Sequence, residues 1–235
     1  MIIRLLSLLE GARQATGTVV IIDVYRAFTT AAVALHAGAA RIILVDHPQK
    51  ALDLRHSGQC DLCFGEVGGV KVPGFDFGNS PHELLRAPVR GKILAQSTSA
   101  GTKGVTAVRA NATLYVAALI NASATAKAVL VTGPAEVSVV AMGSGGKERS
   151  EEDELCALYL RNLLRGGQSD PAAIRSMLRS SCDSTKFGDP DQPHFDPRDL
   201  DIALEVDSIP FAVQVHPEGD LLVAVPKKIE RYLRY

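Results

Sequence analysis

Apolar and polar residues follow one another along the chain in blocks that predict alternating strands and helices. The run VVII, residues 19–22, is made of β-branched residues only and is typical of a strand buried on both faces. An Ala-rich amphipathic stretch at residues 26–38 predicts a helix closed by Gly38, and RIILV at residues 41–45 predicts the next strand. These three segments predict one βαβ unit.

The alternation continues along most of the chain. Further strands are predicted at residues 62–66, 92–96, 113–117 and 137–142, and helices at residues 48–57, 101–110, 121–131, 155–164, 171–182 and 198–207. The N-terminal MIIRLLSLLEG predicts a first strand or helix. Near the C-terminus, PFAVQV and LLVAV flank the turn sequence HPEGD, which predicts a hairpin forming an antiparallel edge. We expect a three-layer α/β/α fold with a mostly parallel, mixed sheet, formed as one domain over residues 1–235.

Composition and charge narrow the classes of function. Hydrophobic residues make up 46% of the chain, aromatic residues only 5%, and tryptophan is absent, which suits parallel strands under helices. The 25 basic and 26 acidic residues nearly cancel, and no basic cluster is interleaved with aromatic residues, so nucleic acid is not an expected partner. No apolar run reaches the roughly 18 residues that span a bilayer. The N-terminal segment does not match a signal peptide, so we expect a cytoplasmic protein that acts on small molecules and not on membranes.

Asp23 and Arg26 stand where the first buried strand meets its helix. The carboxyl end of a strand in an open α/β sheet is where ligands bind, and an arginine at the positive end of a helix indicates an anion nearby. One interpretation is that Asp23 only caps the helix. The other makes Asp23 a metal ligand or a nucleophile, with Arg26 holding a phosphate through two hydrogen bonds. Thr29 lies one turn further on and either shares the face of Arg26 or simply packs.

Two turns offer groups that suit phosphate oxygens. The GNSP turn presents Asn79 and Ser80 at a predicted helix start. The junction between the strand at residues 92–96 and the next helix carries hydroxyls and glycine at Thr98, Ser99, Gly101 and Thr102. An ordinary capped helix start explains this second turn equally well.

Carboxylates at two further positions predict a metal site. Glu66 follows an apolar strand and begins a glycine-rich loop, where a solvated glutamate is the alternative. Glu152 and Asp153 belong to four consecutive acidic residues at a helix start, which is more than capping requires. A hard cation such as Mg²⁺ takes one or two carboxylates together with water and substrate phosphate.

Several motifs in a fixed order add a resemblance to a known family. DVYRAFTTA, FGEVGG, VPGFDFGNSP, TSAGTKG, LINA and GSGG…EEDELCA, spread between residue 19 and about residue 207, together resemble the 2-phosphosulfolactate phosphatase family. The resemblance implies an α/β fold and Mg²⁺-dependent release of phosphate from (2R)-2-phospho-3-sulfolactate, giving 3-sulfolactate, a coenzyme M precursor. The residues on motif positions are Asp23, Arg26, Glu66, Asn79, Ser80, Thr98, Gly101, Thr102, Glu152 and Asp153.

We therefore predict a Mg²⁺-dependent phosphomonoester hydrolase acting on a small phosphorylated acid. Asp23 and Arg26 are the expected catalytic residues. The expected metal ligands are Asp23, Glu66, Glu152 and Asp153, and the expected substrate-binding residues are Arg26, Thr29, Asn79, Ser80, Thr98, Ser99, Gly101 and Thr102.

Three departures from the family pattern bear on the substrate. Phe28, Ser97 and Ala100 stand where related sequences carry other side chains, and each change removes a polar contact. Two alternatives stay open: a phosphatase for a different 2-phospho acid, or a non-catalytic sensor of a small phosphorylated or sulfonated acid. The amphipathic tail KKIERYLRY, residues 227–235, suits packing on the protein's own sheet or on a second copy, which leaves a homo-oligomer open.

Overall fold

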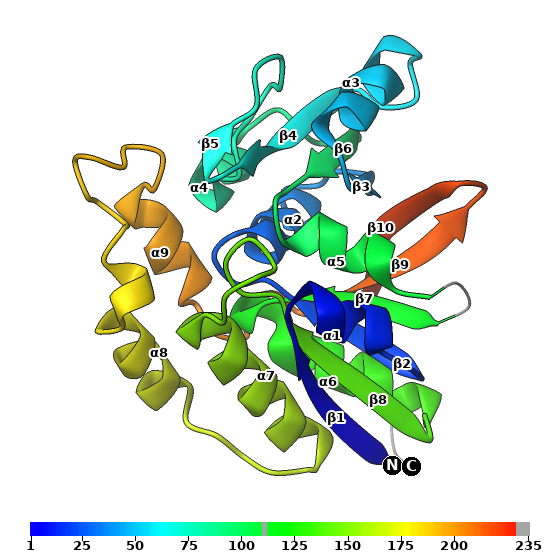
Figure 1. Ribbon diagram of the computed structural model, residues 1–235, viewed down its shortest axis with the longest axis vertical. Coiled ribbons are helices and arrows are strands. Elements are labelled where there is room, and N and C mark those ends of the chain that lie inside the picture. The colour runs from blue at the N-terminus through cyan, green and yellow to red at the C-terminus, as the bar shows by residue number, and fades with distance from the viewer. Residues whose placement is uncertain (110–111, 229–235) are drawn as a thin grey trace.

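A ten-stranded mixed sheet runs through the computed structural model, which describes residues 1–109 and 112–228 (Figure 1). The strands are β1 (Ile2–Ser7), β2 (Thr18–Ile22), β3 (Arg41–Val45), β4 (Leu62–Val67), β5 (Val70–Lys71), β6 (Ile93–Ser97), β7 (Thr113–Ala117), β8 (Glu136–Ala141), β9 (Phe211–Glu218) and β10 (Leu221–Lys228). Their order across the sheet is β1-β8-β2-β7-β9-β10-β3-β6-β4-β5.

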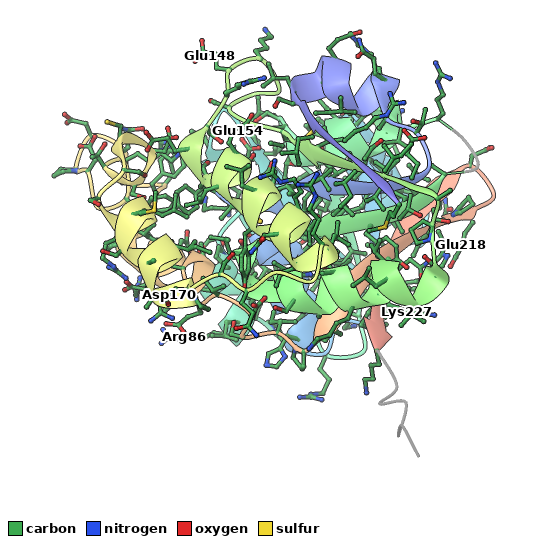
Figure 2. The ribbon with its side chains drawn as sticks, turned by 90° about the horizontal axis from the view of Figure 1, so that it is seen from below. Arg86, Glu148, Glu154, Asp170, Glu218 and Lys227 are labelled. Carbon is green, nitrogen blue, oxygen red and sulfur yellow. The ribbon has the colours of Figure 1, made fainter. Side chains whose placement is uncertain are left out.

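Helices cover both faces of this sheet. They are α1 (Leu8–Gln14), α2 (Ala27–His36), α3 (Pro48–His56), α4 (Pro81–Arg86), α5 (Gly101–Ala107), α6 (Ala122–Thr132), α7 (Glu151–Leu164), α8 (Pro171–Arg179) and α9 (Pro197–Ala203), with 3₁₀ turns η1 (Leu119–Asn121) and η2 (Cys182–Ser184). Helices α1 and α5 pack together on one face, and α6 and α7 pack together on the other (Figure 2). The three-layer α/β/α prediction is confirmed. Over the described ranges, no helix has the length and apolar character needed to cross a membrane.

The hairpin of β9 and β10 lies in the middle of the sheet and joins two parallel half-sheets. Strand β9 runs antiparallel to β7, the last member of the parallel set β1, β8, β2 and β7. Strand β10 runs antiparallel to β3, which begins the parallel set β3, β6 and β4. Because three successive pairings are antiparallel, the two sets run in opposite directions.

The expectation of a hairpin at an edge is therefore wrong. Consecutive residues Phe211, Ala212 and Val213 are all buried, so both faces of β9 are covered as in a central strand. The expected βαβ unit is also wrong, because β2 and β3 belong to different half-sheets. Helix α2 crosses between the half-sheets, and the inserted hairpin determines which strands become neighbours.

Most individual elements agree with the sequence pattern to within a few residues. The N-terminal segment forms both a strand and a helix, β1 and α1. Helix α7 begins at Glu151, so the four acidic residues occupy its first turn. Helices α5, α8 and α9 end earlier than predicted, at Ala107, Arg179 and Ala203. The predicted end of α5 at residue 110 and the tail residues 229–235 lie outside the described residues.

Candidate active site

A cavity of about 430 Å³ lies where strand ends of the two half-sheets come together. One half-sheet contributes Asp23 after β2 and residues 143–145 after β8, and the other contributes Glu66 in β4 and Ser99 after β6. The segment between η2 and α9 also lines the cavity. The lining residues are Asp23, Tyr25, Arg26, Glu66, Gly68, Gly69, Asn79, Ser99, Ala100, Gly143, Ser144, Gly145, Ser150, Glu152, Asp153, Asp183, Lys186, Gln192 and Phe195.

Asp23 both caps its helix and faces this cavity. Its Oδ1 accepts a hydrogen bond from the backbone N–H of Ala27 at 2.9 Å, as the capping interpretation predicted. Burial raises the pKa of Asp23 to about 6, with a further contribution from the negative charge of Glu66. Gly101 lies so close to Asp23 that a Cβ at this position would be 3.0 Å from Oδ2. The TSAGT turn therefore approaches the carboxylate directly.

Glu66 ties two loops together from inside the cavity wall. Its Oε1 accepts the backbone N–H of Ser99 at 2.7 Å, and its Oε2 accepts the backbone N–H of Gly69 at 2.6 Å. The Ser99 hydroxyl lies 2.8 Å from both oxygens. Glu66 is buried, so the solvated alternative does not apply, and most of its hydrogen-bonding capacity is used within the protein.

Glu152 and Asp153 enter the cavity from the first turn of α7. Asp153 accepts backbone N–H groups from Val24 at 2.7 Å and Gly143 at 2.8 Å, which joins the ends of β2 and β8. Burial and the nearby carboxyls of Glu152 and Asp23 raise the pKa of Asp153. Burial also raises the pKa of Glu152 to about 8, although the Lys186 charge opposes this rise.

The anion expected beside Arg26 is a carboxylate of the protein itself. Arg26 Nη1 donates to Asp199 Oδ2 at 2.8 Å and to the His194 carbonyl at 2.7 Å, while Nη2 donates to the Gly69 carbonyl at 3.2 Å. The guanidinium also lies 4.6 Å from the centre of the Phe195 ring. Arg26 lines the cavity, and its Nε has no hydrogen-bond partner among residues 1–109 and 112–228.

Five residues of the expected substrate-binding set do not line this cavity: Thr29, Ser80, Thr98, Gly101 and Thr102. Thr29 donates to the Val24 carbonyl at 2.8 Å. Thr98 and Thr102 bond to each other through backbone and side-chain groups, which stabilises the turn. Ser80 caps α4 and donates to Asp199 Oδ1 at 2.7 Å. Asn79 and Ser99 do line the cavity, whereas Gly101 supports it through its contact with Asp23.

Four buried polar atoms around the cavity have no hydrogen-bond partner within the described structure. They are Arg26 Nε, Asn79 Oδ1, Ser150 Oγ and Glu152 Oε2. Unsatisfied buried polar atoms are uncommon in folded proteins and cost free energy unless a ligand or water pairs with them. Their gathering around one cavity marks it as the candidate binding site.

Sequence reasoning missed the residues that the C-terminal segment brings to the site. Asp183 accepts the backbone N–H of Glu151 at 2.7 Å and so caps α7, where the Ser150 side chain makes no capping bond. Lys186 and Phe195 come from the segment between η2 and α9. Asp199, fully buried, pairs with Arg26 from α9. No local motif marks these residues, because each acts through contacts with distant segments.

The carboxyls around the cavity limit how many protein ligands a metal ion would have there. Within residues 1–109 and 112–228, no three or more His, Cys, Asp or Glu side chains are grouped so as to hold a metal. Glu152 Oε2 is buried without a hydrogen-bond partner among the described residues, and burial raises the pKa values of Asp23 and Glu152. Mg²⁺ usually binds through one or two carboxylates and completes its shell with water and phosphate.

Fold and cavity together define an α/β protein with an acid-rich site at its strand ends. Comparison with known sequences then identifies the family, since the sequence model described as 2-phosphosulpholactate phosphatase matches residues 5–186. The chain belongs to this family of phosphoric monoester hydrolases, as the motif resemblance predicted.

Individual relatives agree with this assignment. The chain is 30% identical over 205 residues to a probable 2-phosphosulfolactate phosphatase of Bacillus subtilis, covering 86% of this chain and 88% of that protein. It is 39% identical over 165 residues to a protein of the same description from Deinococcus radiodurans, covering 68% of each. A third, from Thermus thermophilus, is 38% identical over 130 residues, covering 55% of this chain and 54% of the relative.

Proposed function

We propose that the protein is a Mg²⁺-dependent phosphatase that releases phosphate from 2-phosphosulfolactate to give 3-sulfolactate. The observation that carries the proposal is the group of four unpartnered polar atoms around a cavity rich in carboxyls. Membership of the phosphatase family supports phosphate release as the reaction and 2-phosphosulfolactate as the substrate. A phosphate group together with its metal ion would satisfy donors and acceptors that the fold leaves unpaired.

Glu152 and Asp23 are the proposed metal ligands, since each presents a carboxyl to the cavity. When bound, Mg²⁺ neutralises charge on the phosphoryl oxygens and polarises the phosphorus centre. Asp153 and Glu66 were expected as metal ligands as well. We propose instead that they position the strand ends and loops, because backbone N–H groups occupy their oxygens. Arg26 Nε, which has no hydrogen-bond partner among the described residues, remains to orient the phosphate.

Asp23 has a second proposed role that the same position supports. With Oδ1 held by the Ala27 N–H, the other oxygen of Asp23 would attack phosphorus and displace the C2 oxygen of the substrate, which takes a proton from water; a second water would then release phosphate from the aspartyl-phosphate. Rapid acid quench with labelled substrate decides between the two roles. Recovery of an aspartyl-phosphate on Asp23 identifies a nucleophile, and its absence under single-turnover conditions identifies a metal ligand.

The three departures from the family pattern differ in their relation to the cavity. Ala100 lines it, whereas Phe28 is buried in α2 and Ser97 is buried at the end of β6. Only Ala100 therefore removes a polar group from the cavity wall. A preference for another 2-phospho acid, if measured, is expected to reverse on restoring a polar residue at position 100.

The experiment that tests the proposal measures phosphate release from 2-phosphosulfolactate with Mg²⁺ and with EDTA, alongside a panel of other 2-phospho acids. We expect release that EDTA abolishes and Mg²⁺ restores, and a loss of at least a hundredfold in kcat/KM for Glu152→Gln, roughly the scale of a metal or charge-stabilising contact. Glu148→Gln is the matched control, because Glu148 is exposed at the surface (Figure 2).

Two outcomes contradict the proposal. Release that is insensitive to EDTA removes the metal from the mechanism. An absence of release from every compound, together with tight binding of 3-sulfolactate, supports a non-catalytic sensor.

A further inference from the structure

Lys186 lines the cavity, and its positive charge opposes the rise in the pKa values of Asp23 and Glu152. No ion pair joins its ammonium to a carboxylate in the part of the chain that the structure describes. Its Nζ lies instead over three aromatic rings, 5.2 Å from the centre of Phe195, 5.7 Å from Tyr25 and 5.8 Å from Phe187. These rings attract the charge but accept no conventional hydrogen bond, so the three N–H donors of Lys186 stay available.

The aromatic residues form a fixed support for this side chain. Phe187 packs edge-on against Tyr25 at 5.1 Å between ring centres and against Phe195 at 5.5 Å. Tyr25 is further anchored by a hydrogen bond between its hydroxyl and that of Ser184, 3.0 Å apart. Since Tyr25 precedes Arg26 and Phe195 lies beneath the Arg26 guanidinium, the support is continuous with the site. The ammonium is therefore held at the cavity by groups that leave its hydrogen-bonding capacity unused.

Arg26 does not offer an equivalent free cation. Its charge is paired with the buried Asp199, and both of its terminal nitrogens donate to protein oxygens. The cavity also contains carboxyls from Asp23, Glu66, Glu152, Asp153 and Asp183. A substrate with anionic groups beyond its phosphoryl group needs a further cation there, because like charges in a confined site repel strongly.

We propose that Lys186 is a specificity-determining residue that binds a non-transferred acid group of the substrate, its carboxylate or its sulfonate. This proposal rests on the phosphatase function proposed above. The chain segment carrying Lys186 is separate from the strand ends and α7 that carry the proposed metal ligands. The phosphoryl group binds with the proposed metal ion, and Lys186 holds a carboxylate or sulfonate of the same molecule. Substrates without a second anionic group gain little from it.

The test compares two substrates in the full-length protein with Mg²⁺: 2-phosphosulfolactate, and p-nitrophenyl phosphate, which lacks a second acid group. Lys186→Met keeps the side-chain length and apolar contacts but removes the charge. We expect KM for 2-phosphosulfolactate to rise about tenfold to a hundredfold, the scale of a lost hydrogen bond to a charged group, with a smaller change in kcat. The KM for p-nitrophenyl phosphate is expected to change less than threefold, and Lys186→Arg to recover most of the loss.

Controls separate this binding role from structural damage and from failure of the proposed function. Lys127→Met, at an exposed position on α6, is expected to leave both substrates unaffected. An equal loss on both substrates, or no loss on 2-phosphosulfolactate, overturns the inference about Lys186. If the wild-type protein hydrolyses neither substrate, the proposed function fails instead. Direct binding of 3-sulfolactate, measured by calorimetry, then gives a separate readout, and equal dissociation constants for wild type and Lys186→Met overturn the inference.

Discussion

Glu152 is buried, and one of its carboxyl oxygens has no hydrogen-bond partner in the described part of the chain. The free-energy cost of this arrangement depends on pH. The unfolded chain loses the Glu152 proton near the ordinary pKa of 4.5, whereas burial keeps it on the folded protein until about pH 8. The folded state therefore binds more protons across this window, and the free energy of unfolding falls as pH rises from 4.5 to 8.

Removing this carboxyl is expected to stabilise the metal-free protein at high pH only. Glu152→Gln should raise the free energy of unfolding at pH 8 by on the order of 1–2 kcal/mol relative to wild type, and leave it unchanged near pH 4. Urea titrations at the two pH values, with EDTA present, measure the difference. Adding Mg²⁺ at pH 8 should stabilise wild type more than the variant, and a variant less stable than wild type at pH 8 without metal contradicts this account.

Gly101 is the residue whose small size brings the TSAGT turn against Asp23. A Cβ here would lie 2.8 Å from Ala27 Cβ and 3.0 Å from Asp23 Oδ2, so Gly101→Ala forces the turn and helix α2 apart. We expect a loss of about 1–3 kcal/mol in unfolding free energy, as for other overpacked sites, together with reduced phosphate release. At Gly78 an added Cβ would meet its nearest atoms at 3.6 Å and 3.7 Å, so Gly78→Ala is the stability control. Equal stability of both variants would show that the TSAGT turn accommodates an added Cβ at position 101 without strain.

At the scale of elements, α9 is joined to α2 and α4 through one buried carboxylate. Asp199 accepts hydrogen bonds from Arg26 Nη1 at 2.8 Å, from the Ser80 hydroxyl at 2.7 Å and from the His82 N–H at 3.0 Å. The C-terminal helix therefore fixes the arginine at the start of α2. Asp183 makes a similar connection to the start of α7 through the Glu151 N–H.

Breaking this connection is expected to cost far more than breaking an exposed pair in the same helix. Asp199→Asn leaves the Arg26 charge buried without a counterion, and removal of one partner of a buried pair costs about 3–5 kcal/mol. Asp201→Asn, which breaks the exposed pair with Arg179, should cost less than about 1 kcal/mol. Chemical denaturation of the two variants gives the comparison, and similar costs would mean that the Arg26–Asp199 pair does not hold α9 in place.

Across the whole molecule, the sequence predicts local structure and misses contacts between segments that are distant in the chain. The apolar run before Asp23 specifies a buried strand, and the residues after it specify a helix, so the position of Asp23 at a strand end follows directly. The positions of Glu66, Glu152 and Asp153 follow in the same way. Lys186 and Asp199 reach the site from segments more than 150 residues later in the chain than Arg26, and no spacing rule encodes that contact.

The position of the hairpin in the sheet also depends on contacts between distant segments. A hairpin is specified by its own turn and strands, whereas its neighbours β7 and β3 are chosen by packing that involves the whole chain. An edge position predicts that one side of the hairpin exchanges its amide hydrogens readily. A central position predicts that the amides of β9 and β10 opposite β7 and β3 exchange only when the sheet unfolds, because these stretches are paired on both sides.

Hydrogen exchange followed by mass spectrometry distinguishes these positions. Peptides from residues 211–216 and 222–224 should show protection close to the global free energy of unfolding, since these residues include the registers that pair with β7 and β3. Peptides covering β5, the two-residue strand at the sheet edge, should exchange much faster. Fast exchange of the hairpin while β2 and β8 stay protected would show that the two half-sheets open at this junction. The active-site cavity would then separate along it, because its lining residues come from both halves.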